Sequence, residues 1–164
     1  MLEALDAEGV RYVIIGGTAA AIGGASHVTF DLDITPARDE ANLDRVAAAL
    51  RRLDARVWGL PDGAADSFLL DGKTLANGSS WKFRTAHGEL DVVLDPDGTR
   101  GFEDLRRGAA TTEVYGLTLL VASLEDVIRS KEAAGRERDR AVLDDLRRTL
   151  ELKRRREQDQ VLEA

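Results

Sequence analysis

Two aspartates, Asp31 and Asp33, are separated by one residue and follow a glycine pair, Gly16 and Gly17. If they lie on a β-strand, their spacing directs both carboxylates to the same face. Two carboxylates on one face can hold a divalent cation such as Mg²⁺. The glycines end an apolar, strand-like segment at 11–15, where they allow backbone N–H groups to approach a phosphate chain. Together these features predict a site for a nucleoside triphosphate and Mg²⁺.

A third carboxylate, Asp91, is expected on the second arm of a β-hairpin at 80–94, with its turn at 86–88. Apolar residues at 90, 92 and 94 share one face of that arm, so Asp91 lies on the other face. Three carboxylates could bridge two cations about 3.5–4 Å apart, as two-metal phosphoryl transfer requires. The alternative is that Asp91 lies at a sheet edge and that Glu89 or Asp95 serves equally well. Lys82, on the first arm, is a weaker candidate for contact with phosphate, because basic residues alternating along a half-buried strand usually face solvent.

The segment GGTAAAIGGASHVTFDLDI, residues 16–34, resembles the first motif of the nucleotidyltransferase superfamily that includes DNA polymerase β. Within that superfamily, Gly-Gly-Thr-Ala followed by Thr-x-Asp-Leu-Asp is most similar to the branch of the AbiEii toxin and its relatives. The resemblance covers most of the chain, from about residue 10 to 150, and implies a nucleotidyl-transfer reaction with a third acid on a strand of the form Leu-Asp-Val-Val. We therefore expect two sets of site residues. The residues expected to cradle the triphosphate are Gly16, Gly17 and Thr18, and those expected to bind the metals and act in catalysis are Asp31, Asp33 and Asp91.

Three further residues are candidates for nucleotide binding. His27 stands where many relatives carry an arginine, and it would be positively charged only when protonated, since an unperturbed histidine has a pKa of about 6.5. The alternative is a histidine that fills a loop. Lys131 and Asp139 fall on the inward stripes of two consecutive helices, where an unpaired charge costs several kcal/mol. They either pair with each other or contact the triphosphate. The block that contains them resembles the C-terminal motif of these nucleotidyltransferases, in which a lysine and an aspartate recur.

Composition limits the class of protein. A chain of 164 residues with 43% apolar residues can bury one core, so we expect a nucleotidyltransferase domain at 1–150 followed by a charged helical tail at 151–164. The sequence has no cysteine and two histidines, which excludes a disulfide framework and a cysteine-based zinc site. The N-terminus is acidic, unlike a secretory signal, and glycines and polar residues interrupt the apolar stretch at 12–30. These features favour a cytoplasmic protein without a membrane span.

The charge distribution bears on the partner. A net charge of −7 argues against indiscriminate binding of nucleic acid. Eleven of the 23 basic residues nevertheless lie between positions 129 and 156. This segment is either a solvated helix face or a surface that meets RNA or triphosphate.

The order of elements predicts an α+β nucleotidyltransferase fold, with a mixed sheet, helices packed on it and a helical C-terminus. Strands are expected at 11–15, 29–34 and in the 80–94 hairpin, and helices at 2–8, 19–22, 123–134 and from 136. Thr18 is expected to cap the second helix, and Thr35 and Pro36 to start the next one, whose apolar stripe is at 43, 46, 47, 50 and 53. Residues 61–80 are either a loop near the substrate or a plain connection.

The predicted function is transfer of a nucleoside monophosphate from a nucleoside triphosphate to an RNA or protein acceptor, with Mg²⁺ or Mn²⁺. AbiEii-like relatives include toxins of toxin–antitoxin pairs, so a cognate antitoxin or toxin partner is an expectation. A homodimer is another, because the chain lacks the extra helical domain of larger members. The alternative function is a non-catalytic nucleotide-binding or partner-binding module on the same fold. The triphosphate that is used and the identity of the acceptor stay open.

Overall fold

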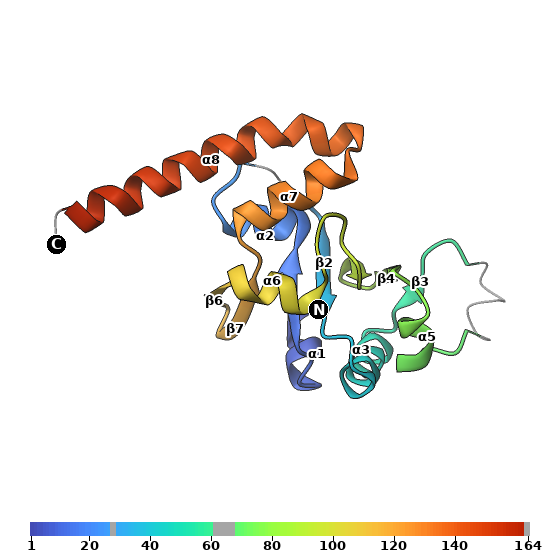
Figure 1. The fold of residues 1–164 in the computed structure, drawn as a ribbon. Coiled ribbons are helices and arrows are strands. Elements are labelled where there is room, and N and C mark those ends of the chain that lie inside the picture. The colour runs from blue at the N-terminus through green and yellow to red at the C-terminus, as the bar shows by residue number, and fades with distance from the viewer. Residues whose placement is uncertain (27–28, 61–67, 163–164) are drawn as a thin grey trace.

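The computed structural model describes residues 1–26, 29–60 and 68–162, which form one mixed sheet covered by helices (Figure 1). The strands in this part of the chain are β1 (Tyr12–Ile15), β2 (Asp31–Pro36), β3 (Arg56–Val57), β4 (Ser80–Thr85), β5 (Gly88–Val93), β6 (Ala110–Val114) and β7 (Leu117–Val121). The helices are α1 (Leu2–Ala7), α2 (Gly16–Ile22), α3 (Glu40–Arg52), α5 (Gly72–Ala76), α6 (Phe102–Gly108), α7 (Leu124–Ala134) and α8 (Glu137–Leu162). The expected α+β organisation is confirmed.

The described strands make a seven-stranded sheet in the order β3-β4-β5-β2-β1-β7-β6. Strand β2 lies in the centre, antiparallel to β1 and parallel to β5. In this register Asp33 is the partner of Ile15 on one side and of Asp91 on the other. The pairing of β2 with β5 therefore brings together carboxylates that are 58 positions apart in the sequence.

The core lies where apolar side chains of the sheet meet the helices. Burial alternates along β5, with Leu90 and Val92 fully buried and Asp91 half-buried, as the sequence pattern predicts. The apolar stripe of α3 is likewise buried as expected, at positions 43, 46, 47, 50 and 53. Burial of each such leucine side chain contributes about 1.5–3 kcal/mol. The core thus holds the β2–β5 pair, and with it the carboxylates, in a fixed register.

Two predicted helix starts are wrong. Strand β2 begins at Asp31 and continues through Thr35 and Pro36, which pair with residues of β1 instead of opening a helix. Pro36 fits there because it is the last residue of the strand. The N-cap of α3 is Asp39, whose carboxylate accepts from the N–H of Asn42 at 3.1 Å. Pairing along a neighbouring strand outweighs the local capping signal at Thr35, whose buried hydroxyl has no hydrogen-bond partner in the described part of the chain.

The second wrong start concerns α2, which begins directly at Gly16 with no loop between it and β1. Thr18 therefore lies inside the helix and does not cap it. Its hydroxyl donates to the backbone carbonyl of Asp31 at 3.0 Å. Thr18 ties α2 to the start of β2, and the helix ends at Gly23 as expected.

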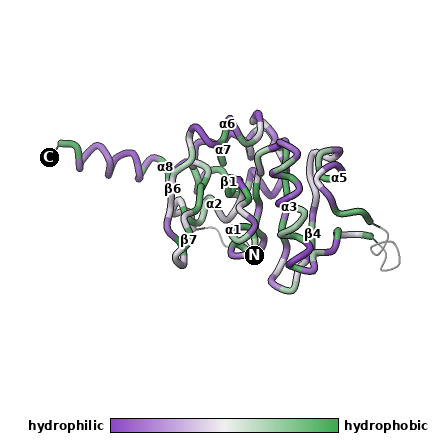
Figure 2. The backbone as a smooth tube through the Cα atoms, turned by 90° about the horizontal axis from the view of Figure 1, so that it is seen from below, coloured by the Kyte–Doolittle hydropathy of each residue, from purple (hydrophilic) through white to green (hydrophobic). Residues whose placement is uncertain are grey.

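The C-terminal helices follow the sequence signals closely. Ser123 caps α7 by accepting from the N–H of Asp126 at 3.1 Å, and Gly135 ends it in the left-handed region at φ 60°. Helix α8 then runs antiparallel to α7 and continues without a break to Leu162. From position 151 onward its described side chains are exposed. Its last turns extend beyond the body and are mostly hydrophilic, although Val161 and Leu162 at its end are apolar (Figures 1 and 2).

Among the described helices, none combines the length and the apolar character that crossing a membrane requires.

Candidate active site

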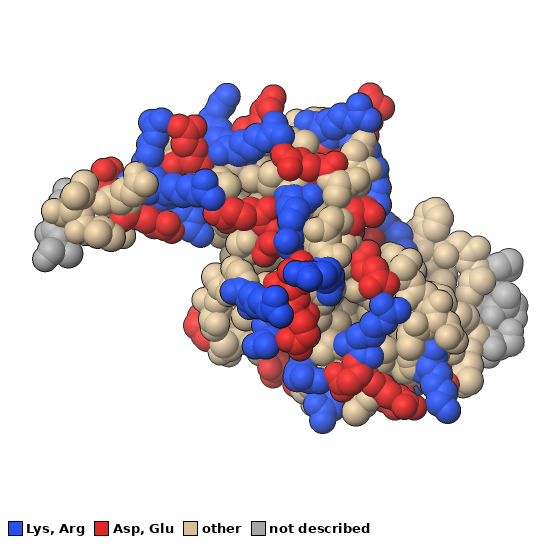
Figure 3. Space-filling model, viewed as in Figure 1, with Lys and Arg blue, Asp and Glu red and all other residues tan. Residues whose placement is uncertain are grey.

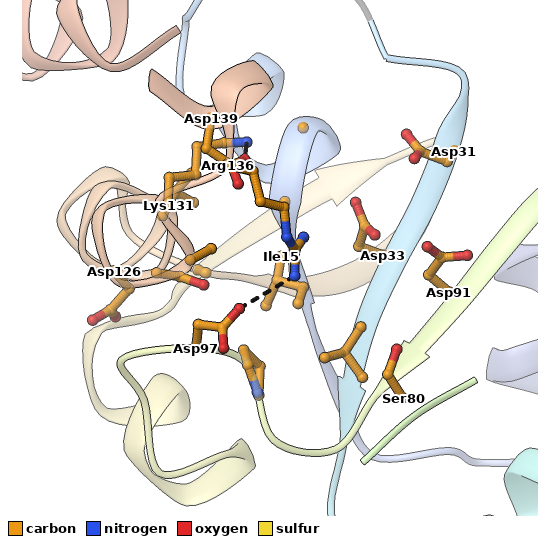
Figure 4. A pocket seen from close by; sticks show the side chains of 18 of the residues that line it. Ile15, Asp31, Asp33, Ser80, Asp91, Asp97, Asp126, Lys131, Arg136 and Asp139 are labelled. Atoms are coloured by element: carbon orange, nitrogen blue, oxygen red, sulfur yellow. Dashed lines mark hydrogen bonds and ion pairs between the residues drawn. The ribbon is translucent and has the colours of Figure 1, made fainter. Parts of the chain in front are cut away.

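Three carboxylates meet at the end of β2 that adjoins α2. Asp31 and Asp33 project from one face of β2, and Asp91 projects beside them from β5 (Figure 4). Each is half-buried, and one oxygen atom from each lies within 4.8 Å of the others. Spacing by two along β2 gives the first two their common face, whereas the parallel pairing with β5 adds the third. The structure brings together the three acids that the sequence singled out.

The three carboxylates repel one another electrostatically. Burial, followed by the neighbouring carboxylates of Asp31 and Asp91, raises the pKa of Asp33 to about 7. Burial also raises the pKa of Asp91, although the ammonium group of Lys82 opposes that shift. The buried Oδ1 atom of Asp91 has no hydrogen-bond partner among the described residues. A hard cation with oxygen ligands would offset both the repulsion and the missing partner. The donor set therefore fits Mg²⁺ or Mn²⁺.

The glycine pair allows α2 to begin directly against this cluster. A Cβ atom on Gly16 would lie 2.1 Å from Oδ2 of Asp33, and the φ of Gly16 is 64°, which strains any other residue. A Cβ atom on Gly17 would lie 2.7 Å from the Cβ of Thr29. The backbone N–H of Gly17 hydrogen-bonds to Asp33 and partly offsets the rise in its pKa. Both glycines are required at this site by close packing, and both line the adjoining cleft.

Thr29 also belongs to the site, although the sequence did not single it out. It stands just before β2, lines the cleft, and donates its hydroxyl to Oδ1 of Asp31. Its position two residues before Asp31 is the threonine of Thr-x-Asp-Leu-Asp. That motif was the available signal for Thr29, whose side chain orients a carboxylate.

A cleft of about 640 Å³ opens in front of the carboxylates. One wall is formed by the ends of β2 and β5, and the opposite wall by α7 and the start of α8. Lys131, Arg136 and Arg138 contribute positive charge to the second wall. Arg136 reaches across to the loop after β5, where it pairs with Asp97 at 3.3 Å (Figure 4). The acids Asp126 and Asp139 line the same wall. A cleft with a carboxylate cluster on one side and three basic side chains on the other suits a metal-bound polyphosphate.

The predicted pair Lys131 and Asp139 is present. Nζ of Lys131 lies 3.1 Å from Oδ1 of Asp139, with side chains that are 18% and 7% exposed. The second oxygen of Asp139 is buried without a hydrogen-bond partner in the described part of the chain. Both residues line the cleft, so the ion pair and a contact with substrate are compatible. Arg136 and Arg138 were not selected from the sequence, although their position directly after the Gly135 stop was the available signal.

Lys82 is also a cleft residue. It faces Asp91 across the β4–β5 pair, and its ammonium group lies 2.8 Å from Glu89 and 3.7 Å from Asp91. The hydrogen bond with Glu89 and the nearby carboxylates raise the pKa of Lys82. The side chain is partly exposed, yet it lies on the carboxylate side of the sheet. The alternation of basic residues along β4 would by itself have placed Lys82 on the solvent side of the sheet.

The remaining candidates lie elsewhere. Thr18 borders a smaller hollow that α1 and the β6–β7 turn also line, and not the main cleft. His27 lies outside the described residues, as do positions 61–67 of the segment expected to be a loop. Of the rest of that segment, Ser79 and Ser80 line the cleft, while Phe68 packs edge-on against Trp81 at 5.6 Å between ring centres.

No family model matches the sequence, and no curated protein matches it. Among solved structures, the chain is similar to a provisionally assigned nucleotidyltransferase from Thermotoga maritima (TM1012), with 17% identity and a TM-score of 0.54 over 87% of this chain and 84% of that one. It is also similar to the antibiotic-resistance factor ANT(2'')-Ia, with 15% identity and a TM-score of 0.56 over 99% of this chain and 90% of that one. At such identities the likeness shows the fold. The expected nucleotidyltransferase fold is confirmed, and the AbiEii branch stays a prediction.

Proposed function

We propose that this chain is a metal-dependent nucleotidyltransferase that moves a nucleoside monophosphate from a nucleoside triphosphate to a hydroxyl group of an RNA or protein acceptor. The observation that carries the proposal is the meeting of three carboxylates at one wall of a cleft whose other wall holds Lys131, Arg136 and Arg138. The shared fold supports it, because one of the two similar structures is assigned as a nucleotidyltransferase and the other is the antibiotic-resistance factor ANT(2'')-Ia. An unpartnered buried carboxylate oxygen in the cluster adds further support.

Asp31, Asp33 and Asp91 would hold Mg²⁺ or Mn²⁺. When bound, the metal would neutralise charge on the triphosphate and activate the acceptor oxygen. Thr29 holds the carboxylate of Asp31 in orientation through its hydroxyl group. Gly17 does the same for Asp33 through its N–H. The acids are thus fixed before any ligand arrives, which reduces the cost of assembling the site.

The triphosphate would lie between the carboxylates and the α7–α8 wall. Lys131 has three N–H donors and uses one for Asp139, so two stay available for phosphate oxygens. Arg136 would exchange Asp97 for a phosphate oxygen, and the exposed Arg138 has no ion pair with the described residues. Gly16 would let the chain of phosphates pass close to the backbone.

In the transfer step the acceptor hydroxyl oxygen forms a bond to the α-phosphorus. The bond from that phosphorus to the oxygen bridging to the β-phosphate breaks, and pyrophosphate leaves with the electron pair. The proton of the hydroxyl passes to the carboxylate of Asp91 and then to solvent. Asp91 suits this role because it lines the cleft in which the acceptor hydroxyl would lie.

The test is calorimetric titration with each of the four ribonucleoside triphosphates in Mg²⁺, for the wild type and for Asp31→Ala/Asp33→Ala. We expect binding of at least one triphosphate that requires the metal and is lost in the double variant. Asp144→Ala serves as the control, since that carboxylate is 93% exposed on α8. Failure of every triphosphate to bind the wild type would overturn the proposal.

A role as the toxin of a toxin–antitoxin pair extends this proposal, because it follows from the resemblance to AbiEii-like relatives. Expression of the wild type in a bacterial host should then arrest growth, while Asp31→Asn should not. Equal growth of the two strains would reject the toxin role. Binding of a triphosphate without transfer to any acceptor would instead favour the non-catalytic module.

A further inference from the structure

The cleft contains hydroxyl groups of the chain itself. Among the described residues they belong to Thr29, Ser79, Ser80 and Ser130. A hydroxyl group held beside the reacting phosphate competes with any outside acceptor, because its reaction needs no encounter between two molecules. Thr29 is already engaged, since its hydroxyl donates to Oδ1 of Asp31. The three serines therefore have to be distinguished by where they lie. Lys and Arg side chains gather over the junction of α7 and α8, above the body of the molecule (Figure 3).

The direction of attack separates these serines. In nucleotidyl transfer the attacking oxygen and the leaving pyrophosphate lie roughly in line, on opposite sides of the α-phosphorus. The basic side chains that would hold the leaving phosphates, Lys131, Arg136 and Arg138, all lie on the α7–α8 wall. The attacking hydroxyl should therefore come from the opposite wall. Ser130 belongs to α7, on the leaving-group side, whereas Ser80 begins β4, on the side of the carboxylates.

The register of the β4–β5 hairpin places Ser80 near Asp91. Ser80 pairs with Val93, which lies two residues after Asp91 on β5. Because side chains alternate along a strand, Ser80 and Asp91 share one face of the sheet, and both line the cleft (Figure 4). They are diagonal neighbours across the strand pair, a relation in which Cβ atoms lie within about 7–8 Å of each other. The serine hydroxyl and the carboxylate of Asp91 thus reach into the same part of the cleft.

The hydroxyl group of Ser80 is free to react. Its side chain is exposed and forms no hydrogen bond with the described residues. The neighbouring Ser79 precedes the strand, and its carbonyl group accepts from the N–H groups of Leu94 and Asp95 at 2.8 and 3.3 Å. That contact fixes the start of β4 against the end of β5. A free hydroxyl beside a carboxylate that can take its proton is the arrangement that a serine nucleophile requires.

We propose that the chain transfers a nucleoside monophosphate to its own Ser80. The inference rests on the proposed nucleotidyl transfer and names one acceptor for it. Oγ of Ser80 forms a bond to the α-phosphorus, and the bond from that phosphorus to the oxygen bridging to the β-phosphate breaks. Pyrophosphate leaves with the electron pair, and the proton of the serine passes to Asp91 and then to solvent. The product is a phosphodiester that joins the serine to the nucleoside.

The position of Ser80 makes this reaction intramolecular and self-limiting. Ser80 lines the same cleft as the carboxylates of its own chain, so no second copy is needed. After one transfer the attached nucleoside monophosphate keeps its phosphate at the carboxylates, where a second triphosphate would have to bind. Each chain should therefore take up one nucleotide and then lose its affinity for triphosphate.

The test is intact-protein mass spectrometry after incubation with each of the four ribonucleoside triphosphates in Mg²⁺. The mass of the wild type should rise by one nucleoside monophosphate, and fragmentation should locate the added group on Ser80. Ser80→Ala and Asp31→Ala/Asp33→Ala should show no rise. Ser79→Ala and Ser130→Ala, which remove other hydroxyl groups of the cleft, are the matched controls and should be modified as the wild type is.

A mixture of two proteins tests the intramolecular route. The wild type is incubated together with an affinity-tagged Asp31→Ala/Asp33→Ala chain, which keeps Ser80 and differs in mass. Only the wild type should gain a nucleotide, with a rate constant that does not change with protein concentration. Modification of the tagged chain by the wild type would overturn the intramolecular route.

Calorimetry separates this inference from the proposed function. Ser80→Ala should bind triphosphate normally, which also shows that it is folded, whereas the modified wild type, freed of nucleotide, should show no binding. Triphosphate binding without an adduct, or an adduct on another residue, would overturn the inference. Transfer to an RNA or another protein by that same unmodified chain would leave the proposed function standing. Failure of every triphosphate to bind would instead reject the proposed function.

Discussion

Replacement of Asp33 by asparagine should stabilise the metal-free protein at neutral and alkaline pH. The change keeps the shape of the side chain and removes its charge. Burial and two neighbouring carboxylates raise the pKa of Asp33 from 3.8 to about 7. An acid whose pKa is higher in the folded state binds its proton more tightly there, so the wild type loses stability as the pH rises from about 4 to 7. Asparagine does not ionise, so the variant lacks this loss.

The magnitude follows from the size of the shift. A rise of about three pKa units corresponds to about 4 kcal/mol of differential interaction. In the presence of EDTA at pH 8, Asp33→Asn should therefore be more stable than the wild type by up to about 4 kcal/mol. At pH 4 the wild-type carboxyl is protonated in the folded state, so the two proteins should agree within about 1 kcal/mol.

The assay is equilibrium urea unfolding in EDTA at pH 4, 6 and 8, for the wild type, Asp33→Asn and Asp144→Asn. The last variant changes a carboxylate that is 93% exposed and should alter the pH dependence little. Addition of Mg²⁺ at a hundred times its dissociation constant should raise the stability of the wild type by about 2.7 kcal/mol and that of Asp33→Asn by much less. The reasoning would be refuted if Asp33→Asn and the wild type had the same free energy of unfolding at pH 8. It would also be refuted if the difference in that free energy were equal at pH 4 and pH 8.

Three further changes test the architecture around the site by thermal or urea unfolding. Gly16→Ala should destabilise the protein by more than about 2 kcal/mol, because its Cβ would lie 2.1 Å from a carboxylate oxygen. The control is Gly116→Ala, at a glycine with φ 77° where an added Cβ would meet no atom within 4 Å, so its loss of stability measures backbone strain alone. An equal loss of stability in both variants would contradict the steric explanation. Lys131→Met should cost about 3–5 kcal/mol by leaving Asp139 buried without a counter-charge, and adding Asp139→Leu should recover most of it. If that double variant is stable but binds triphosphate as tightly as the wild type, Lys131 has a structural role only. Ser123→Ala should cost about 1 kcal/mol through loss of the α7 cap, and a value near zero would mean that water replaces the cap fully.

The local sequence pattern was sufficient to predict features that depend on a single strand or helix. Period-two spacing placed Asp31 and Asp33 on one face because side chains alternate along any strand. The apolar stripe of α3 and the start and end of α7 at Ser123 and Gly135 were read correctly for the same reason. Each of these signals depends on backbone geometry within a few residues, so no knowledge of the rest of the chain was needed.

Thr35 and Pro36 show where the local signal fails. Their capping pattern is genuine, but β1 offers them a partner strand, and pairing with it in a buried sheet outweighs a cap on the surface. Thr18 was misread in the same way, because its hydroxyl is used by the carbonyl of Asp31 across the α2–β2 contact. In both cases the competing interaction comes from a segment that is distant in the sequence.

Residue types and their spacing along the chain thus predict which side chains could carry the chemistry and which face of its own element each one occupies. The position of Asp91 beside Asp33, which favours it over the alternatives Glu89 and Asp95, required the tertiary structure, because parallel pairing of β2 with β5 depends on the whole sheet. The packing of α7 and α8 on the body likewise brings Arg136 and Arg138 to the cleft that the carboxylates line. Distances between elements arise from the packing of the complete core, and no periodicity within a single segment encodes them.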